Sequence, residues 1–83
     1  MNYKPYTNMQ DDKPFIVRTY AKQELALMYF PNATPHTAVN RLGSWIKRNK
    51  LLTSALHRLH YNKNSKYFTT REVSKIIYYL GPP

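Results

Sequence analysis

The residues best suited to contact another molecule lie between positions 34 and 50 of the chain. Wound at about 100° per residue, this segment places its apolar side chains in one sector and its polar side chains in the opposite one. The polar side chains near its start are of types that hydrogen-bond to base edges: His36, Thr37, Asn40, Arg41 and Ser44. Asn pairs with adenine and Arg with guanine in the DNA major groove. Lys47, Arg48 and Lys50 follow, and we expect them to contact phosphates, which position a protein without specifying a sequence.

The charge of the chain favours a polyanionic partner. Thirteen Lys and Arg stand against four Asp and Glu, and no acidic residue lies between Leu25 and Arg71. A folded unit with this balance repels itself, and a nucleic acid would relieve the repulsion. Small basic proteins also stay soluble through their charge, so this signal alone does not establish nucleic-acid binding.

Catalytic chemistry has few of the parts it needs. The chain has no cysteine and only two glycines, so thiol chemistry and a glycine-rich phosphate loop are excluded. Glu24 and Glu72 belong to different helix starts and do not form an acid/base pair. His57 and His60 would face one ion from a helix, but a structural zinc site requires four ligands. We therefore expect no enzyme activity, no metal and no cofactor.

Two alternatives to DNA remain open. Tyr61 and Tyr67 flank Lys63 and Lys66, an arrangement suited to stacking and phosphate contacts with RNA or single strands. We prefer DNA, with Lys63 and Lys66 as further phosphate contacts. The basic, tyrosine-rich surface would also fit an acidic protein partner, because Tyr and Arg are enriched in interface hot spots.

The location of the protein is indicated by what its sequence lacks. No apolar run approaches the roughly 20 residues of a membrane span, and the first residues show no secretory signal. The absence of cysteine fits a reducing compartment. We expect a cytoplasmic protein that does not contact membranes; the sequence gives no indication of its oligomeric state.

The elements that must position these residues are helical. We predict a disordered tail over residues 1–14 and a single helical domain over residues 15–83. The fold class is all-α, a compact bundle of about four short helices, helix-turn-helix-like, with a short extended lead-in over residues 15–20. The tail is polar, with prolines and no periodicity, whereas the rest alternates helical patterns with turn signals.

The two central helices have recognisable boundaries. The first is predicted from Lys22 to Phe30, with Glu24 reaching back to the backbone N–H of Ala21. The second begins after Thr34, a good N-cap, with a proline in the first helical position. The turn between them lacks the glycine usual in a helix-turn-helix, a departure from the tight motif. Gly43 lies at the edge of the second helix, where we expect another backbone to approach closely.

The third helix is predicted over residues 51–60, followed by a basic loop over 61–67 that forms a flexible turn or a small wing. The fourth begins at a capping box made by Thr69 and Glu72 and stops at Gly81. The predicted core comprises Leu25, Ala26, Tyr29, Ala38, Leu42, Trp45, Ile46, Leu52, Leu56, Leu59, Phe68, Val73, Ile76, Ile77 and Leu80.

Three stretches of this chain resemble a known family. They are "RTYAKQELALMYFP", "TPHTAVNRLGSWI" and "FTTREVSKIIYYLGPP", and the family consists of small bacterial proteins catalogued as domain of unknown function 4248. The resemblance covers residues 15–82 and rests on apolar positions and helix caps. It implies a compact bacterial domain, and it supplies no catalytic or binding residue.

Overall fold

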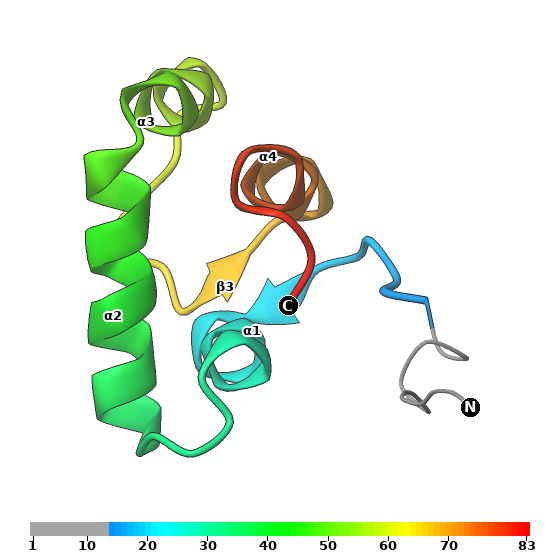
Figure 1. Cartoon of the computed structure of the whole chain (residues 1–83). Coiled ribbons are helices and arrows are strands. Elements are labelled where there is room, and N and C mark those ends of the chain that lie inside the picture. Colours follow the sequence, from blue (N-terminus) through cyan, green and yellow to red (C-terminus); the bar gives the residue numbers. More distant parts are fainter. Residues whose placement is uncertain (1–13) are drawn as a thin grey trace.

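Four helices and one pair of short strands make up residues 14–83, the part of the chain that the computed structural model describes (Figure 1). The helices are α1 (Lys22–Tyr29), α2 (Pro35–Arg48), α3 (Lys50–Arg58) and α4 (Thr70–Leu80). The strands are β2 (Tyr20–Ala21) and β3 (Tyr67–Phe68). The predicted mostly helical fold with a short lead-in is confirmed. Of the predicted tail, all but Pro14 lies outside the described residues.

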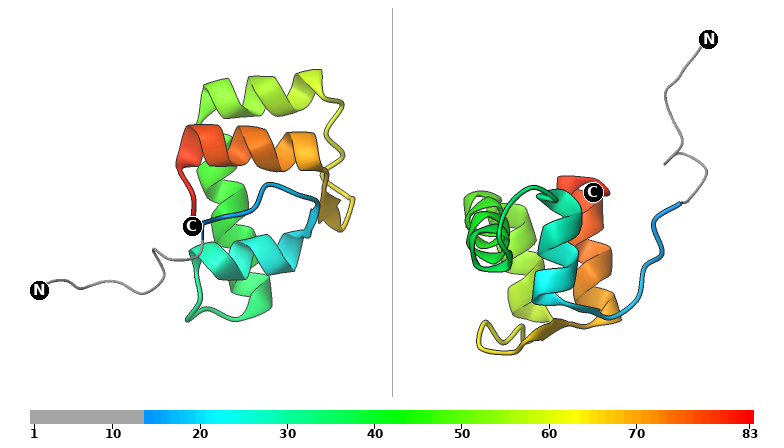
Figure 2. Two further views of the ribbon diagram at one scale, coloured as in Figure 1. Left: turned by 90° about the vertical axis from the view of Figure 1, so that its right-hand side faces the viewer. Right: turned by 90° about the horizontal axis from the view of Figure 1, so that it is seen from below.

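The longest helix, α2, crosses the other three. Figure 2 shows α1, α3 and α4 running side by side with similar axes, while α2 lies across one side of this layer. One face of α2 therefore packs on its neighbours. No other described element covers the opposite face (Figure 1).

The start of α2 agrees with the prediction. Thr34 adopts an extended conformation and its Oγ1 accepts a hydrogen bond from the backbone N–H of Thr37 at 3.3 Å. Pro35 occupies the first turn, where its missing N–H costs no hydrogen bond. These local signals fix where the outer face of α2 begins.

The start of α1 differs in the role of one carboxylate. Glu24 forms an ion pair with Arg18, Nη2 to Oε2 at 2.9 Å. This hydrogen bond from Arg18 is the main reason that the pKa of Glu24 lies below its ordinary value, and the backbone N–H of Ala21 contributes least. The predicted capping by Glu24 is thus secondary to an ion pair with the lead-in.

The third helix begins and ends earlier than predicted. Asn49 separates it from α2 and caps it, since its Oδ1 accepts from the backbone N–H of Leu52 at 2.9 Å. The helix stops at Arg58, and His60 adopts a positive φ of 59°. A non-glycine residue in this left-handed region ends the helix, which the sequence pattern did not indicate.

The two strands join segments that are far apart in the sequence. Tyr20 pairs with Phe68 and Ala21 with Tyr67 in antiparallel register, and the backbone N–H of Lys22 continues the contact to the carbonyl of Lys66 at 2.9 Å. The lead-in therefore pairs only at its end. The basic loop is closed against the start of α1.

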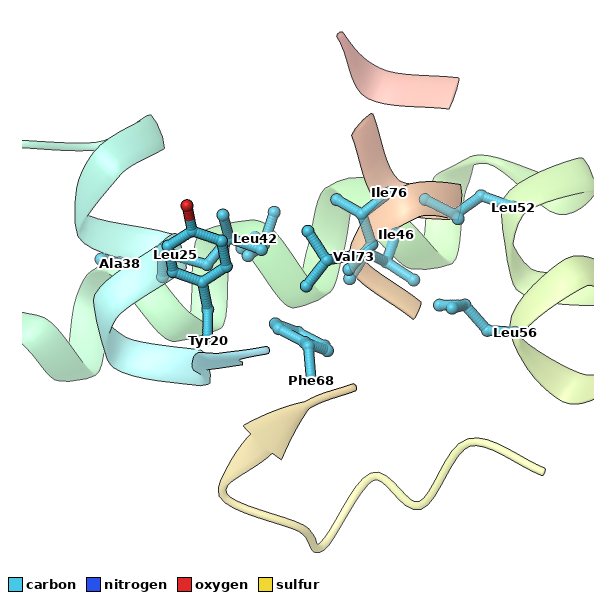
Figure 3. Close-up of a cluster of buried hydrophobic side chains, with 11 residues drawn as sticks. Tyr20, Leu25, Ala38, Leu42, Ile46, Leu52, Leu56, Phe68, Val73 and Ile76 are labelled. Atoms are coloured by element: carbon cyan, nitrogen blue, oxygen red, sulfur yellow. The ribbon is translucent and has the colours of Figure 1, made fainter. Parts of the chain in front are cut away.

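The core lies between the helical layer and α2. Figure 3 shows Leu42 and Ile46 of α2 among side chains from α1, α3, α4 and β3. The members of this cluster are Tyr20, Leu25, Ala26, Ala38, Leu42, Ile46, Leu52, Leu56, Phe68, Val73 and Ile76. Most were predicted, but Tyr20 was missed because the lead-in was not assigned to the core.

Five predicted core residues are not fully buried. Trp45 is 40% exposed, and the others are half-buried: Tyr29, Leu59, Ile77 and Leu80. The indole of Trp45 packs edge-on against Phe30, the residue that follows α1, with ring centroids 4.7 Å apart.

The capping box of α4 is complete. The backbone N–H of Glu72 donates to Thr69 Oγ1 at 3.2 Å, and Glu72 Oε1 accepts from the backbone N–H of Thr69 at 2.8 Å. This exchange satisfies the carboxylate of Glu72 although only 5% of the residue is exposed.

We expect Thr69→Ala to lower the free energy of unfolding by about 1 kcal/mol, because one backbone donor of the first turn loses its acceptor. Thermal unfolding followed by circular dichroism measures the change. Ser74→Ala, at an exposed position within the same helix, is the control and should have little effect. An unchanged melting temperature in Thr69→Ala would contradict the role of the cap.

Candidate nucleic-acid interface

The predicted contact residues are exposed apart from Thr37, which is half-buried. Thr37 takes part in the cap of α2, where its hydroxyl accepts a hydrogen bond from Thr34 Oγ1 at 3.0 Å. Apart from His36 and Lys66, the others lie at three places on the surface. One place is a groove beside α2, the second is the turn between α1 and α2, and the third is the corner between α2 and α3.

The groove lies between α2 and the loop that follows α3, and its volume is about 490 Å³. Asn40, Ser44 and Lys47 line it from α2, each one turn from the next, and Lys63 and Asn64 line it from the loop. Lysines from two separate elements thus share one groove. The structure brings together predicted residues that are far apart in the sequence.

The loop is held in place by Lys22, a residue that sequence reasoning assigned only to a helix start. Its Nζ donates to the carbonyl of Lys63 at 3.0 Å and lies 4.6 Å from the ring centroid of Tyr61. Both Lys22 and Tyr61 line the groove. No pattern in the sequence marks this contact, because it joins positions about forty residues apart.

The first turns of α2 carry a hydrogen-bonded pair. The side-chain amide of Asn40 lies 3.2 Å from Nε2 of His36, one helical turn away, and both residues are exposed. This contact limits the rotamers of both side chains. Two of the predicted base-contacting groups are therefore partly ordered before any ligand binds.

Arg41 lies on the other side of the exposed face. It lines a recess with Thr37 and Phe30 at the turn between α1 and α2. Its guanidinium carbon is 5.9 Å from the ring centroid of Phe30, within the range of a cation–π contact. Arg41 therefore does not line the groove that Asn40, Ser44 and Lys47 line.

Arg48 and Lys50 lie at the corner between α2 and α3, beside Trp45. Lys66 belongs to the loop, and its carbonyl accepts the backbone N–H of Lys22 at 2.9 Å. These three residues do not line the groove. The single interface predicted from the sequence is thus spread over separate surfaces.

The carboxylates of the described chain are both engaged elsewhere. Glu24 is paired with Arg18, and Glu72 is buried in the cap of α4. Within residues 14–83 no Asp or Glu side chain lines the groove or forms an ion pair with Lys47 or Lys63. Among residues 14–83, the lysines of the groove therefore have no carboxylate partner.

The described residues hold no group of three or more His, Cys, Asp or Glu side chains placed to bind a metal ion. Over the same range, 14–83, none of the helices is long and apolar enough to cross a membrane.

A family model matches residues 16–83 and carries the description Domain of unknown function (DUF4248). The chain belongs to this family. The match covers every helix and every predicted contact residue, which confirms the resemblance seen in the sequence. No curated protein and no solved structure matches the chain. The description of the family assigns no function.

Gly43 lines the groove from the middle of α2. A Cβ built at this position meets no heavy atom within 4 Å among the described residues, so the predicted close approach of another backbone is wrong. The space beside Gly43 opens into the groove.

We expect Gly43→Ala to raise the free energy of unfolding by up to about 1 kcal/mol, because Ala is the better helix former and nothing obstructs its methyl group. In a domain of this size that corresponds to a rise in melting temperature of about 4–8 °C. A lower melting temperature would show that the added methyl group disturbs the helix.

Proposed function

We propose that this protein binds duplex DNA in the cytoplasm, with the exposed face of α2 in the major groove. The observation that carries the proposal is the groove lined by Lys47 of α2 and Lys63 of the loop, which no Asp or Glu side chain of residues 14–83 lines. A helix and a loop that present cations together fit a helix that enters DNA while a neighbouring loop contacts the backbone.

The shape of α2 favours duplex DNA over duplex RNA. Its 14 residues span about 21 Å at 1.5 Å per residue, and no described element covers its outer face (Figure 2). The major groove of B-form DNA admits a helix, whereas that of A-form RNA is too narrow. Residues 30–34 join α1 to α2, and we infer that the two helices act as a helix-turn-helix-like unit with α2 as the helix that enters the groove.

The residues divide into base-contacting and phosphate-contacting roles. We assign base contacts to His36, Asn40, Arg41 and Ser44, which lie in the N-terminal and central turns of α2. We assign phosphate contacts to Lys47 and Lys63, which line the protein's own groove from α2 and from the loop. Thr37 has a smaller role than the sequence indicates, because its hydroxyl already belongs to the helix cap.

Fluorescence anisotropy tests the proposal with a labelled random duplex, a single strand of the same length and an acidic polypeptide, each at several salt concentrations. We expect the duplex to bind most tightly, with log affinity falling by about 0.9 per decade of salt for each phosphate neutralised. Absence of duplex binding at low salt would refute it. Tighter binding of the single strand would instead indicate a single-strand-binding protein, in which bases stack on Tyr61 and Tyr67.

A further inference from the structure

A second surface lies at the corner where α2 meets α3, away from the groove. Trp45, Leu51 and Leu80 surround a shallow recess of about 590 Å³ there. Leu51 is 69% exposed and Trp45 is 40% exposed, so both present apolar area to solvent. Neighbouring exposed apolar side chains of this kind are typical of interaction sites.

The base of this recess is fixed. Trp45 packs edge-on against Phe30, and its ring centroid is 6.1 Å from that of Tyr29. The hydroxyl of Tyr29 donates to the carbonyl of Gly81, which ties the C-terminal segment to α1 next to Leu80. Burial raises the pKa of Tyr29 to about 12, so this hydroxyl remains a donor at neutral pH.

The rim of the recess is cationic. Arg48 and Lys50 line it together with Asn49. In the part of the chain from 14 to 83, neither cation forms an ion pair with a carboxylate. Apolar and cationic side chains thus line the same recess, a combination that a phosphate backbone alone would not use.

We propose that this corner binds an acidic segment of a partner protein, with one apolar anchor residue between Trp45 and Leu51 and carboxylates next to Arg48 and Lys50. Charge complementarity decides the occupant. A second copy of this chain would bring the same excess of positive charge to the contact, which disfavours self-association. An acidic partner neutralises the rim and buries the exposed indole and leucine.

The proposal goes beyond DNA binding and does not rest on it. The corner uses Arg48 and Lys50, which the sequence had grouped with the phosphate contacts, whereas the groove uses Lys47 and Lys63. The two sites therefore involve different side chains. A variant of the corner can therefore be tested for DNA binding, and a variant of the groove for peptide binding, as a check that the two sites are independent.

Trp45 is the only tryptophan in the chain, so its fluorescence reports directly on this corner. The probe is a synthetic peptide of Glu and Asp with one central Leu. We expect its binding to shift the Trp45 emission to shorter wavelength. A peptide with Lys in place of the acids, and an acidic peptide with Ser in place of Leu, should give no shift at the same concentration.

Two variants locate the contact. Leu51→Ser removes an exposed apolar side chain and should lower the affinity for the acidic peptide by about ten-fold, as expected for one lost apolar contact. The affinity for the DNA duplex should be unchanged. Arg48→Gln with Lys50→Gln should also lower the affinity for the acidic peptide by about ten-fold and make this binding less dependent on salt, since two exposed ion pairs are lost. Arg71→Gln with Lys75→Gln on α4 is the charge-matched control and should bind the peptide normally.

Several results would overturn this assignment. Emission that shifts with protein concentration alone would place a second copy at the corner. A duplex that shifts the emission and loses affinity in Leu51→Ser would make the corner part of the DNA surface. Failure of the acidic peptide to shift the emission at low salt, with circular dichroism showing a folded protein, would remove the proposal without affecting DNA binding through the groove.

Discussion

Replacing Lys47 and Lys63 together by alanine should remove about two phosphate contacts and so make DNA binding less dependent on salt. Each lost contact changes the slope of log affinity against log salt by about 0.9, so affinity at 0.1 M salt should fall roughly 60-fold if affinity at 1 M salt is unchanged. Both residues are exposed, and their replacement should leave the fold intact. Anisotropy titrations at four or more salt concentrations give the slope and the affinity together.

The matched control for this experiment is Arg71→Ala with Lys75→Ala, which removes the same charge from the exposed side of α4. Arg71 and Lys75 are one turn apart, and neither lines the groove. If the control loses as much affinity as the groove variant, net charge and not the groove drives binding. If the groove variant keeps the slope of the native protein, Lys47 and Lys63 do not contact DNA.

The second large effect concerns stability. Leu42→Ala should lower the free energy of unfolding by about 2–5 kcal/mol, because a fully buried side chain leaves a cavity. Leu42 is 1% exposed and belongs to the core cluster, where it lies beside Leu25 of α1 (Figure 3). Stabilities of small domains are commonly about 5–15 kcal/mol, so a large part of the protein's stability would be lost.

Trp45→Ala is the informative comparison, because both residues lie in the apolar sector of α2. With 40% of Trp45 exposed, we expect a loss of about 1–2 kcal/mol, mainly from its edge-on aromatic contacts. Urea unfolding of both variants measures the difference. Equal losses would mean that Trp45 contributes as much to the core as Leu42. The indole would then be a core side chain, and the proposed binding site at the corner would lose its aromatic residue.

The four helices and most of their boundaries can be predicted from local sequence patterns. The caps at Thr34 and Thr69 act within one turn, so three or four neighbouring residues suffice to predict them. The apolar periodicity likewise places Leu42 and Ile46 on the inner face of α2, because helical geometry is local. The separation of α2 into a buried side and a basic side was therefore evident before any tertiary contact was known.

Which of those polar residues lie together depends on contacts between distant parts of the chain. The groove exists because Lys22 holds the loop beside α2, and because β2 and β3 pair across more than forty residues. Contacts of this separation depend on how the helices cross, which no local pattern encodes. The exposure of Trp45 was decided in the same way. Its position on the helix is set locally, but its 40% exposure depends on how the neighbouring elements pack around it.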